Sequence, residues 1–426
     1  MYSKRMITIF EDRYSDVELS ENEVEEVLSL EPLWGKHHLL FRADNKLLMK
    51  HYVGFVATKN LQIQTLPKVY QYTSIMDEKQ EQKESIALLF RMLFYSGFIN
   101  VKEIPDAQTV ANFDGDILEI FISIFIKRFL ALYNRNVHRN YESIVEKSGL
   151  IKGKILFNES IKASHGLHHT HVVEYDHFTE NTIINQIVKT VITQLLKVTK
   201  RKENKFLLKK GLIYLEDVQM IWLTEHTFKK VRFNRLNESY KPIVELAKAF
   251  ALKRQPGMMK GDPTTLTFLV PVHKLFEQTV FTAIKGHFDR SEGWTVRKEA
   301  PQKDLVPNVG YRLKPDITVS NNGQIKVIVD AKYKNPFRDS NVTVREADLY
   351  QMVTYAARYN CSQVYLIYPK FKGHHTKENP IAEYQIPVMG DREVKITVVQ
   401  MNIHEEGLGA DELGRIVREG GTWGQE

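Results

Sequence analysis

The segment from Tyr311 to Tyr355, YRLKPDITVSNNGQIKVIVDAKYKNPFRDSNVTVREADLYQMVTY, decides the fold of this chain. Apolar runs on either side of Asn321-Asn322-Gly323 predict a β-hairpin, because Asn and Gly tolerate the positive φ angles of a tight turn. Asp316 lies on the first arm, and Asp330 and Lys332 lie on the second. Residues two apart on a strand share a face, so the hairpin can bring these three charged side chains together.

Two carboxylates and an ammonium on one sheet predict a particular chemistry. Neighbouring carboxylates repel each other unless a cation lies between them, and Mg²⁺ prefers oxygen ligands while it keeps several waters. Such an ion polarises a phosphodiester and helps to generate hydroxide, and Lys332 would offset the charge that develops during attack. The alternative is a surface hairpin with an ordinary ion pair. The apolar residues Val327–Val329 before Asp330 indicate a buried strand, which favours a metal-dependent nuclease.

Predicted helices on either side of the hairpin add further candidate residues. The downstream helix places Gln351 and Tyr355 four residues apart, where both can meet a substrate. The upstream helix carries Glu277 beside its apolar face, where it can supply a third carboxylate. The apolar positions that predict the two helices are Leu349, Met352, Val353 and Ala356 in one, and Val272, Leu275, Phe276, Val280 and Ile284 in the other.

These elements together resemble a known group of enzymes. The PD-(D/E)xK nuclease superfamily is matched by helical Glu277, Pro315-Asp316, Asp330-Ala331-Lys332 and Gln351-x-x-x-Tyr355, the last element resembling its RecB-type branch. Between residues 50 and 370 the chain is also similar to the McrC family, the nuclease subunits of McrBC modification-dependent restriction systems. That similarity includes Tyr52-Val53-Gly54, Leu66-Pro67-Lys68, Lys152-Gly153-Lys154 and the segments 119–133 and 178–187.

The resemblance implies an α/β fold. A C-terminal restriction-endonuclease-like core, a mixed sheet flanked by helices, would follow a mixed β-rich and helical N-terminal region. It also implies Mg²⁺-binding residues, which are Asp316, Asp330, Ala331 through its carbonyl, and Glu277 directly or through water. Lys332 would position the attacking water, and Gln351 and Tyr355 would orient the substrate strand or the network of the site.

McrC-like proteins work with an AAA+ GTPase, McrB, whose hexamer recognises methylated DNA. The resemblance implies that residues 1–250 dock on such a ring and stimulate GTP hydrolysis, and that this chain is the endodeoxyribonuclease of a methylcytosine-directed restriction complex. GTP is expected on the partner, because Gly149 and Gly153 are too close for a phosphate-binding loop and Ile155 replaces its Ser or Thr. The alternative is a regulatory subunit that activates the GTPase without cutting DNA.

The length of 426 residues suggests two or three domains. We expect a β-rich docking domain at 1–75, a mainly helical region at 76–255, the nuclease domain at 265–400 and a flexible tail at 403–426. Gly and Pro residues between Arg254 and Thr265 mark the clearest boundary. Phe178–Leu196 is expected to form a helix capped by Thr179.

The net charge of +7 is compatible with a polyanionic partner such as DNA. The candidate DNA contacts are Lys200, Arg201, Lys202, Lys229, Lys230, Arg232 and Lys334. Such charged runs are also typical of solvated surfaces, and phosphate contacts would position DNA without reading its sequence.

Other features exclude or leave open further classes of site. The single cysteine, Cys361, excludes a disulfide framework and a Cys-based zinc site. No secretion signal is visible at the N-terminus, and the most apolar segment, Ile117–Tyr133, carries charges that favour a core helix over a membrane span. A cytoplasmic location without a membrane partner is expected. The histidines His165, His168, His169 and His171 are either a metal site or, as their spacing favours, part of a loop.

Overall fold

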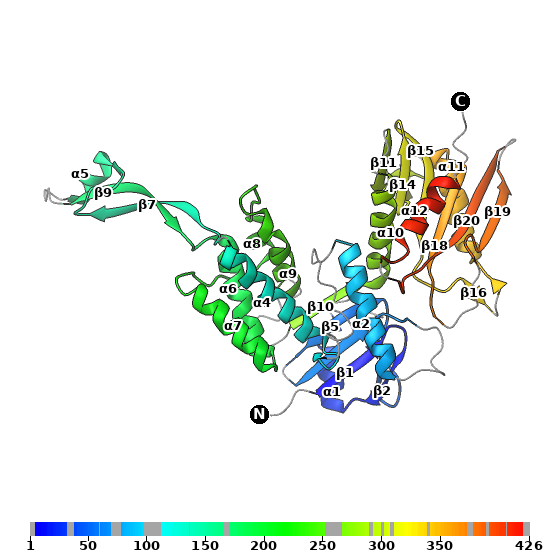
Figure 1. The fold of residues 1–426 in the computed structure, drawn as a ribbon, viewed down its shortest axis with the longest axis horizontal. Helices are drawn as coiled ribbons and strands as arrows, with labels where there is room; N and C mark the ends of the chain where they lie inside the picture. Colours follow the sequence, from blue (N-terminus) through cyan, green and yellow to red (C-terminus); the bar gives the residue numbers. More distant parts are fainter. Residues whose placement is uncertain are drawn as a thin grey trace. The chain divides into compact units, whose positions relative to one another are not determined.

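The computed structural model shows a mixed α/β chain. It describes residues 5–31, 38–58, 60–69, 78–97, 112–135, 137–164, 170–251, 266–288, 293–299, 302–306, 311–338, 341–372, 378–388, 392–405 and 407–420. The chain forms two compact units (Figure 1). The split unit comprises Met1–Ile117 and Thr267–Glu426, and the inserted unit comprises Leu118–Leu266. The predicted boundary within 254–265 falls outside the described residues.

The split unit contains a six-stranded sheet in the order β11-β14-β15-β18-β20-β19. Its strands are β11 (Trp294–Lys298), β14 (Ile317–Asn321), β15 (Gln324–Ala331), β18 (Gln363–Pro369), β20 (Glu393–Met401) and β19 (Ala382–Pro387). The predicted hairpin is confirmed, since β14 and β15 pair antiparallel and Asn322 and Gly323 adopt positive φ angles of 47° and 82°. Strands β15, β18 and β20 run parallel, so the sheet is mixed.

Helices cover both faces of this sheet. Ile328 and Leu366 pack in one core with Met352 of α11 (Glu346–Tyr359). The neighbouring residue Tyr365 points to the other face, where its hydroxyl donates a hydrogen bond to the Ile416 carbonyl in α12 (Ala410–Glu419). Helix α10 (Val272–Phe288) packs against α12, β11 and β15. The alternation of side chains along β15 and β18 therefore explains the two layers of helices.

Helix α12 corrects the expectation of a flexible tail at 403–426. Leu413 and Val417 lie four residues apart and are 1% and 0% exposed. A Cβ at Gly414 would lie 2.7 Å from the His287 side chain, so glycine is what allows α12 to approach α10 this closely. The apolar face of α12 contains too few residues for a packed helix to be predicted from the sequence.

A second part of the split unit is built on the N-terminal strands. Strand β6 (Leu61–Leu66) pairs parallel to β1 (Arg5–Phe10) and antiparallel to β5 (Tyr52–Ala57), and β10 (Leu266–Pro271) completes the sheet. Strands β2 (Tyr14–Glu18), β4 (Lys46–Met49) and β3 (Leu39–Phe41) form a separate sheet. Strands β5 and β6 form a hairpin, and the Ser20 side chain caps helix α1 (Glu21–Leu28). Helix α2 (Glu78–Tyr95) packs on β6 and on α10.

The inserted unit has a helical core. Its helices are α4 (Ile117–Arg135), α6 (Ile183–Val198), α7 (Lys202–Tyr214), α8 (Glu225–Lys229) and α9 (Lys241–Ala251). Phe121 and Phe125 of α4 meet Phe250 of α9 edge to face at 6.4 and 5.9 Å between ring centres. The apolar α4 is thus a core helix, as predicted. Within the described part of the chain, no helix combines the length and apolar character needed to span a membrane.

A long hairpin extends away from these helices (Figure 1). Strands β7 (Asn140–Ser148) and β9 (His171–Thr179) pair along their whole length, and β8 (Lys154–Ile155) and α5 (Phe157–Ser164) lie at its far end. The predicted helix from Phe178, capped by Thr179, is wrong, because both residues end β9 and α6 begins at Ile183 after its cap Thr182. Apolar and polar residues alternate along β9, a pattern that fits a strand paired with β7 better than a helix.

Candidate active site

The β14–β15 hairpin brings the two predicted aspartates together. Asp316 immediately precedes β14, and its Oδ2 accepts a hydrogen bond from the backbone N–H of Ala331 at 3.0 Å. Ala331 follows Asp330, which lies near the end of β15 and is 1% exposed. The Asp316 carboxylate is therefore fixed against the backbone of the residue beside Asp330.

Lys332 connects this pair to helix α11. Its ammonium lies 2.7 Å from Asp330 Oδ2 and donates a hydrogen bond to Gln351 Oε1 at 3.0 Å. Gln351 Nε2 donates to the Tyr355 hydroxyl at 2.8 Å, and that hydroxyl donates to the Lys314 carbonyl at 3.1 Å. Since Tyr355 is only 4% exposed, its position supports an orienting role through Gln351 rather than direct contact with a substrate.

Glu277 enters the site from α10. It is 3% exposed, and its carboxylate pairs with Lys274 at 2.6 Å and with Lys298 at 3.5 Å. Neither lysine was predicted from the sequence as a partner of Glu277. The spacing of Lys274 three residues before Glu277 on a helix was a usable signal, whereas Lys298 lies on β11 and reaches the site only through the fold.

Several of these residues line a cavity of about 320 Å³, but the predicted site residues Asp330, Gln351 and Tyr355 are not among its lining residues. It is lined by His273, Lys274, Glu277, Asp316, Ala331, Lys332, Tyr333 and Lys334. The ammonium of Lys334 forms an ion pair with Asp348, so this predicted phosphate contact already has a protein partner. The cavity presents both signs of charge, with carboxylates beside Lys332.

Negative charge in the cavity is only partly compensated. Burial, and then the charges of Asp330 and Glu277, raise the pKa of Asp316 to about 7. Burial also raises the pKa of Asp330, although Lys332 opposes this effect. Burial disfavours the charged form of Lys332, but the carboxylate of Asp330 outweighs it and the pKa of Lys332 is raised. Among the described residues, lysine ion pairs reach Glu277 and Asp330 but not Asp316.

The carboxylate and carbonyl oxygens of the site are the candidate ligands for a divalent cation. Among the described residues, no three His, Cys, Asp or Glu side chains are grouped to hold a metal together, so Glu277 is not gathered with the aspartates as a direct ligand. Two features do fit a hard cation. Buried Asp330 Oδ2 and Glu277 Oε1 meet lysine ammonium groups, at 2.7 Å from Lys332 and 3.5 Å from Lys298, and accept no other hydrogen bond among the described residues. Carboxylate and carbonyl oxygens are the ligands that Mg²⁺ prefers.

Comparison with known proteins places this chain in a family. The model of the McrBC 5-methylcytosine restriction system component family matches residues 47–369. The chain belongs to the McrBC family. It is 27% identical over 286 residues to the type IV methyl-directed restriction enzyme EcoKMcrBC of Escherichia coli K12, a match that covers 63% of this chain and 79% of that protein.

Two solved structures share the fold of this McrBC family member. One is described as a half-complex of Thermococcus gammatolerans McrB AAA+ hexamers with bound McrC, with a TM-score of 0.73 and 21% identity over 98% of this chain and all (100%) of that chain. The other is described as the cryo-EM structure of the Thermococcus gammatolerans McrBC complex, with a TM-score of 0.53 and 22% identity over 69% of this chain and 90% of that chain.

The remaining predicted contacts of this McrBC family member lie in the inserted unit. Lys200, Arg201 and Lys202 lead into α7, and Lys229, Lys230 and Arg232 lie at the end of α8. Phe228, next to the second basic group, is buried in the core, whereas Trp222 is 80% exposed and was not predicted to be so. His165, His168 and His169 lie outside the described residues, and His171 begins β9.

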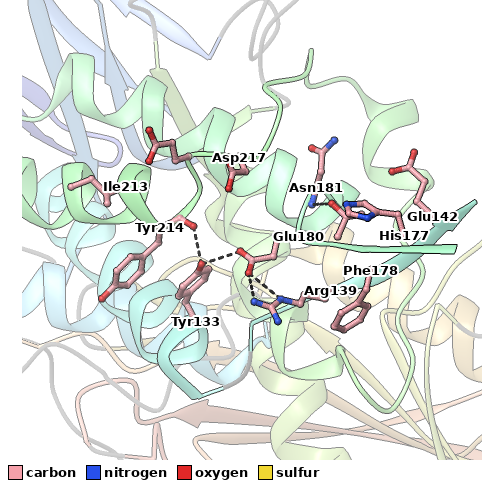
Figure 2. Close-up of a pocket in the computed structure, with 12 residues that line it drawn as sticks. Tyr133, Arg139, Glu142, His177, Phe178, Glu180, Asn181, Ile213, Tyr214 and Asp217 are labelled. Carbon is pink, nitrogen blue, oxygen red and sulfur yellow. Dashed lines mark hydrogen bonds and ion pairs between the residues drawn. The ribbon is translucent and has the colours of Figure 1, made fainter. Parts of the chain in front are cut away.

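A second cavity, of about 800 Å³, lies in the inserted unit at the base of the long hairpin (Figure 2). Tyr133, Arg139, Glu180 and Tyr214 line it together with residues of β7 and β9. Arg139 pairs with Glu180 at 2.6 Å, and the Tyr133 hydroxyl lies 3.0 Å from Glu180 Oε2 and 2.8 Å from the Tyr214 carbonyl.

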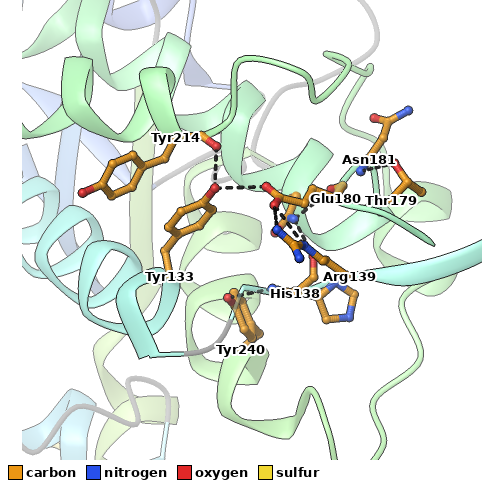
Figure 3. A network of polar contacts seen from close by, with 9 residues as sticks. Tyr133, His138, Arg139, Thr179, Glu180, Asn181, Tyr214 and Tyr240 are labelled. Atoms are coloured by element: carbon orange, nitrogen blue, oxygen red, sulfur yellow. Dashed lines mark hydrogen bonds and ion pairs between the residues drawn. The ribbon is translucent and has the colours of Figure 1, made fainter. Parts of the chain in front are cut away.

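These contacts form a network that joins the hairpin to the helices (Figure 3). Burial and Glu180 raise the pKa of Tyr133 to about 12, so this hydroxyl stays protonated near neutral pH. His138, just before β7, contacts the Thr182 hydroxyl at 2.7 Å, and its backbone N–H donates to the Tyr240 hydroxyl at 3.2 Å. The network therefore fixes the root of the hairpin and does not resemble an acid–base centre.

Proposed function

We propose that this chain is the Mg²⁺-dependent endodeoxyribonuclease subunit of a GTP-dependent restriction complex directed at methylcytosine. In this proposal the six-stranded sheet with α10 and α11 is a PD-(D/E)xK core. The observation that carries the proposal is the convergence of Asp316 Oδ2 on the Ala331 N–H at 3.0 Å, beside buried Asp330 and its ion pair with Lys332 at 2.7 Å.

Each site residue has a role that its surroundings support. Asp316, Asp330 and the Ala331 carbonyl would hold Mg²⁺, which when bound supplies Lewis-acid polarisation of the phosphodiester and a more acidic water. Glu277 would act through a bound water, because it is not grouped with the aspartates. Lys332, held by Gln351, would orient the attacking water and stabilise the charge that develops on the phosphate.

The inserted unit supports a partner-binding role. Its hairpin exposes several large apolar side chains, which are Tyr141, Val145, Leu150, Ile151, Phe157, Ile161 and Phe178. Exposed apolar surface of this kind marks protein interfaces. The Thermococcus gammatolerans structure is described as containing McrB AAA+ hexamers with bound McrC. We extend this arrangement to the present chain and propose that residues 1–250 dock on an AAA+ GTPase hexamer and stimulate it.

DNA contacts and location are further parts of the proposal. Lys202, Lys229, Lys230 and Arg232 are exposed and would contact phosphates, and Lys200 and the half-buried Arg201 lie beside Lys202. The complex would act in the cytoplasm.

Cleavage assays with the complete system test the proposal. Methylated and unmethylated DNA are incubated with the chain, with and without its partner GTPase, GTP and Mg²⁺. We expect cleavage of methylated DNA by the wild type only with all components, and no cleavage by Asp330→Ala, which should still stimulate the GTPase. Cleavage by Asp330→Ala at the wild-type rate would contradict the site assignment.

A second candidate function is a regulatory subunit that activates the GTPase and does not cut. The observation in its favour is that three metal-binding side chains are not grouped within the described residues. Full GTPase stimulation by a wild type that never cuts DNA, with every component present, would favour this candidate.

A further inference from the structure

A residue of the N-terminal part lies against the wall of the candidate active site. Lys68 follows β6, and Tyr333 follows Lys332 and lines the cavity. The Tyr333 hydroxyl is 3.5 Å from the Lys68 carbonyl oxygen, a contact across 265 positions of sequence. The Lys68 ammonium lies 6.0 Å from the centre of the Tyr333 ring. The neighbour of the proposed catalytic lysine is thus held by a residue outside the six-stranded sheet.

Lys68 is itself fixed in place. Its ammonium lies 3.4 Å from Glu11 Oε2 and 3.2 Å from Asp12 Oδ2, and 5.8 Å from the centre of the Phe371 ring. Glu11 is 3% exposed, so this ion pair is shielded from water and from salt. Two carboxylates and two rings restrain one ammonium in direction as well as distance. We call this group, Glu11, Asp12, Lys68, Tyr333 and Phe371, the Lys68 clamp.

The Tyr333 ring transmits this restraint to the cavity. It packs against Phe276 at 5.6 Å and Phe371 at 5.8 Å between ring centres. Phe276 precedes Glu277, and Tyr333 lies between Lys332 and Lys334, so the clamp is adjacent to three residues of the cavity wall. The Lys332 N–H also donates to the Ile367 carbonyl at 2.8 Å, which fixes the backbone on the strand side. Displacing the ring would turn this short backbone segment and move the Lys332 ammonium.

We propose that Lys68 is a positioning residue for Lys332 and acts through Tyr333. The N-terminal sheet therefore helps to set the geometry of the cleavage site. This inference rests on the proposed nuclease function. Small displacements of a reacting group lower the rate of the chemical step more than they lower binding.

Two matched lysine variants test the proposal within the assembled complex. Lys68→Met removes the clamp cation. Lys372→Met is the control, because Lys372 also ties the C-terminal part to the N-terminal part, through an ion pair with Glu84 at 2.7 Å, and Glu84 lies outside the Lys68 clamp. We expect Lys68→Met to lower kcat for DNA cleavage by about tenfold at unchanged KM. Lys372→Met should retain the wild-type kcat, and Lys68→Arg should restore most of it.

A second set of measurements distinguishes an effect on the position of Lys332 from an effect on stability. Amide hydrogen exchange at Lys332 reports its bond to Ile367 directly, and we expect faster exchange in Lys68→Met than in Lys372→Met. The double variant Lys68→Met/Glu11→Gln removes the unpaired buried carboxylate, so it separates the loss of positioning from a loss of stability. We expect its kcat to stay low while its melting temperature recovers.

The outcomes are distinguishable. Wild-type kcat and exchange in Lys68→Met, or equal changes in both lysine variants, would overturn the positioning role while the nuclease proposal stands. A wild type that does not cut with all components present would overturn the nuclease proposal, and the exchange data would still decide whether Lys68 holds the Lys332 segment.

Discussion

Two buried carboxylates, one in each unit, are held in opposite ways. Glu119 of α4 is 2% exposed and accepts hydrogen bonds from the Thr199 hydroxyl at 2.6 Å and the Asn204 amide at 2.7 Å. The backbone N–H groups of Lys200 and Arg201 also donate to it. Asp330 of β15 is 1% exposed, and its Oδ2 meets the Lys332 ammonium at 2.7 Å and accepts no other hydrogen bond among the described residues.

The difference separates a structural charge from a functional one. A buried carboxylate surrounded by donors ties elements together, as Glu119 ties α4 to the start of α7. A buried carboxylate that meets one ammonium keeps lone pairs that can bind a further ligand. Glu119 thus stabilises the helical core of the inserted unit, whereas Asp330 keeps this binding capacity next to Ala331 and Lys332, which line the cavity. Four variants test this difference.

The largest effect is expected at the lysine of the site. Lys332→Met should lower kcat for DNA cleavage by about 10²- to 10³-fold, because it removes charge stabilisation at the phosphate. Lys326→Met is the matched control, since Lys326 is an exposed lysine on β15, the strand that Lys332 follows. Rates are measured in the complete complex at saturating DNA. Equal activity of the two variants would show that Lys332 has no role in the chemistry.

The next effect tests the structural carboxylate. Glu119→Gln should lower the free energy of unfolding by about 2 kcal/mol, because the amide replaces an acceptor oxygen by a donor and faces buried N–H groups. Chemical denaturation followed by circular dichroism measures this change. The cleavage rate per folded molecule should be unchanged. A loss of cleavage without a loss of stability would contradict the purely structural role of Glu119.

The third effect has the opposite sign. Asp316 has a folded-state pKa of about 7, above its ordinary value, so its contribution to stability is present at low pH and is lost as the pH rises through 7. Asp316→Asn lacks this charge and should be more stable than the wild type by about 2 kcal/mol at pH 8 without Mg²⁺, and equal to it near pH 4. Denaturation at both pH values checks this. A less stable variant at pH 8 would mean that the carboxylate is structural.

The smallest effect concerns the docking surface. Ile161→Ser on α5 should weaken binding to the partner GTPase by about tenfold, since Ile161 is 73% exposed in the free chain and would lose its apolar contact. Ile213→Ser on α7 is the control, because Ile213 is 70% exposed on another element. Binding is measured by interferometry with the purified partner. An equal loss of binding affinity in both variants would show that the interface is not confined to the hairpin.

Local patterns predicted much of the split unit. The two-residue alternation of Asp330 and Lys332, the Asn322-Gly323 turn and the four-residue spacing of Gln351 and Tyr355 each depend on neighbours in sequence. The Lys68–Tyr333 contact could not be predicted, because it joins residues 265 positions apart.

The inserted unit was harder to predict. Phe178 lies at the change from strand to helix, where its apolar neighbours fit both patterns and only pairing with β7 selects the strand. The exposure of Trp222 was also hidden, since an aromatic residue in a sequence is usually buried and its surroundings depend on the whole unit.

Cation binding by the aspartate pair decides whether the buried carboxylates of the split unit form a metal site. Mn²⁺, titrated as a spectroscopic substitute for Mg²⁺, is followed by electron paramagnetic resonance in the wild type, Asp330→Asn and Glu119→Gln. We predict that the wild type and Glu119→Gln bind Mn²⁺ with the same affinity and that Asp330→Asn does not bind it. Undiminished binding by Asp330→Asn would contradict the assignment of this carboxylate as a metal ligand.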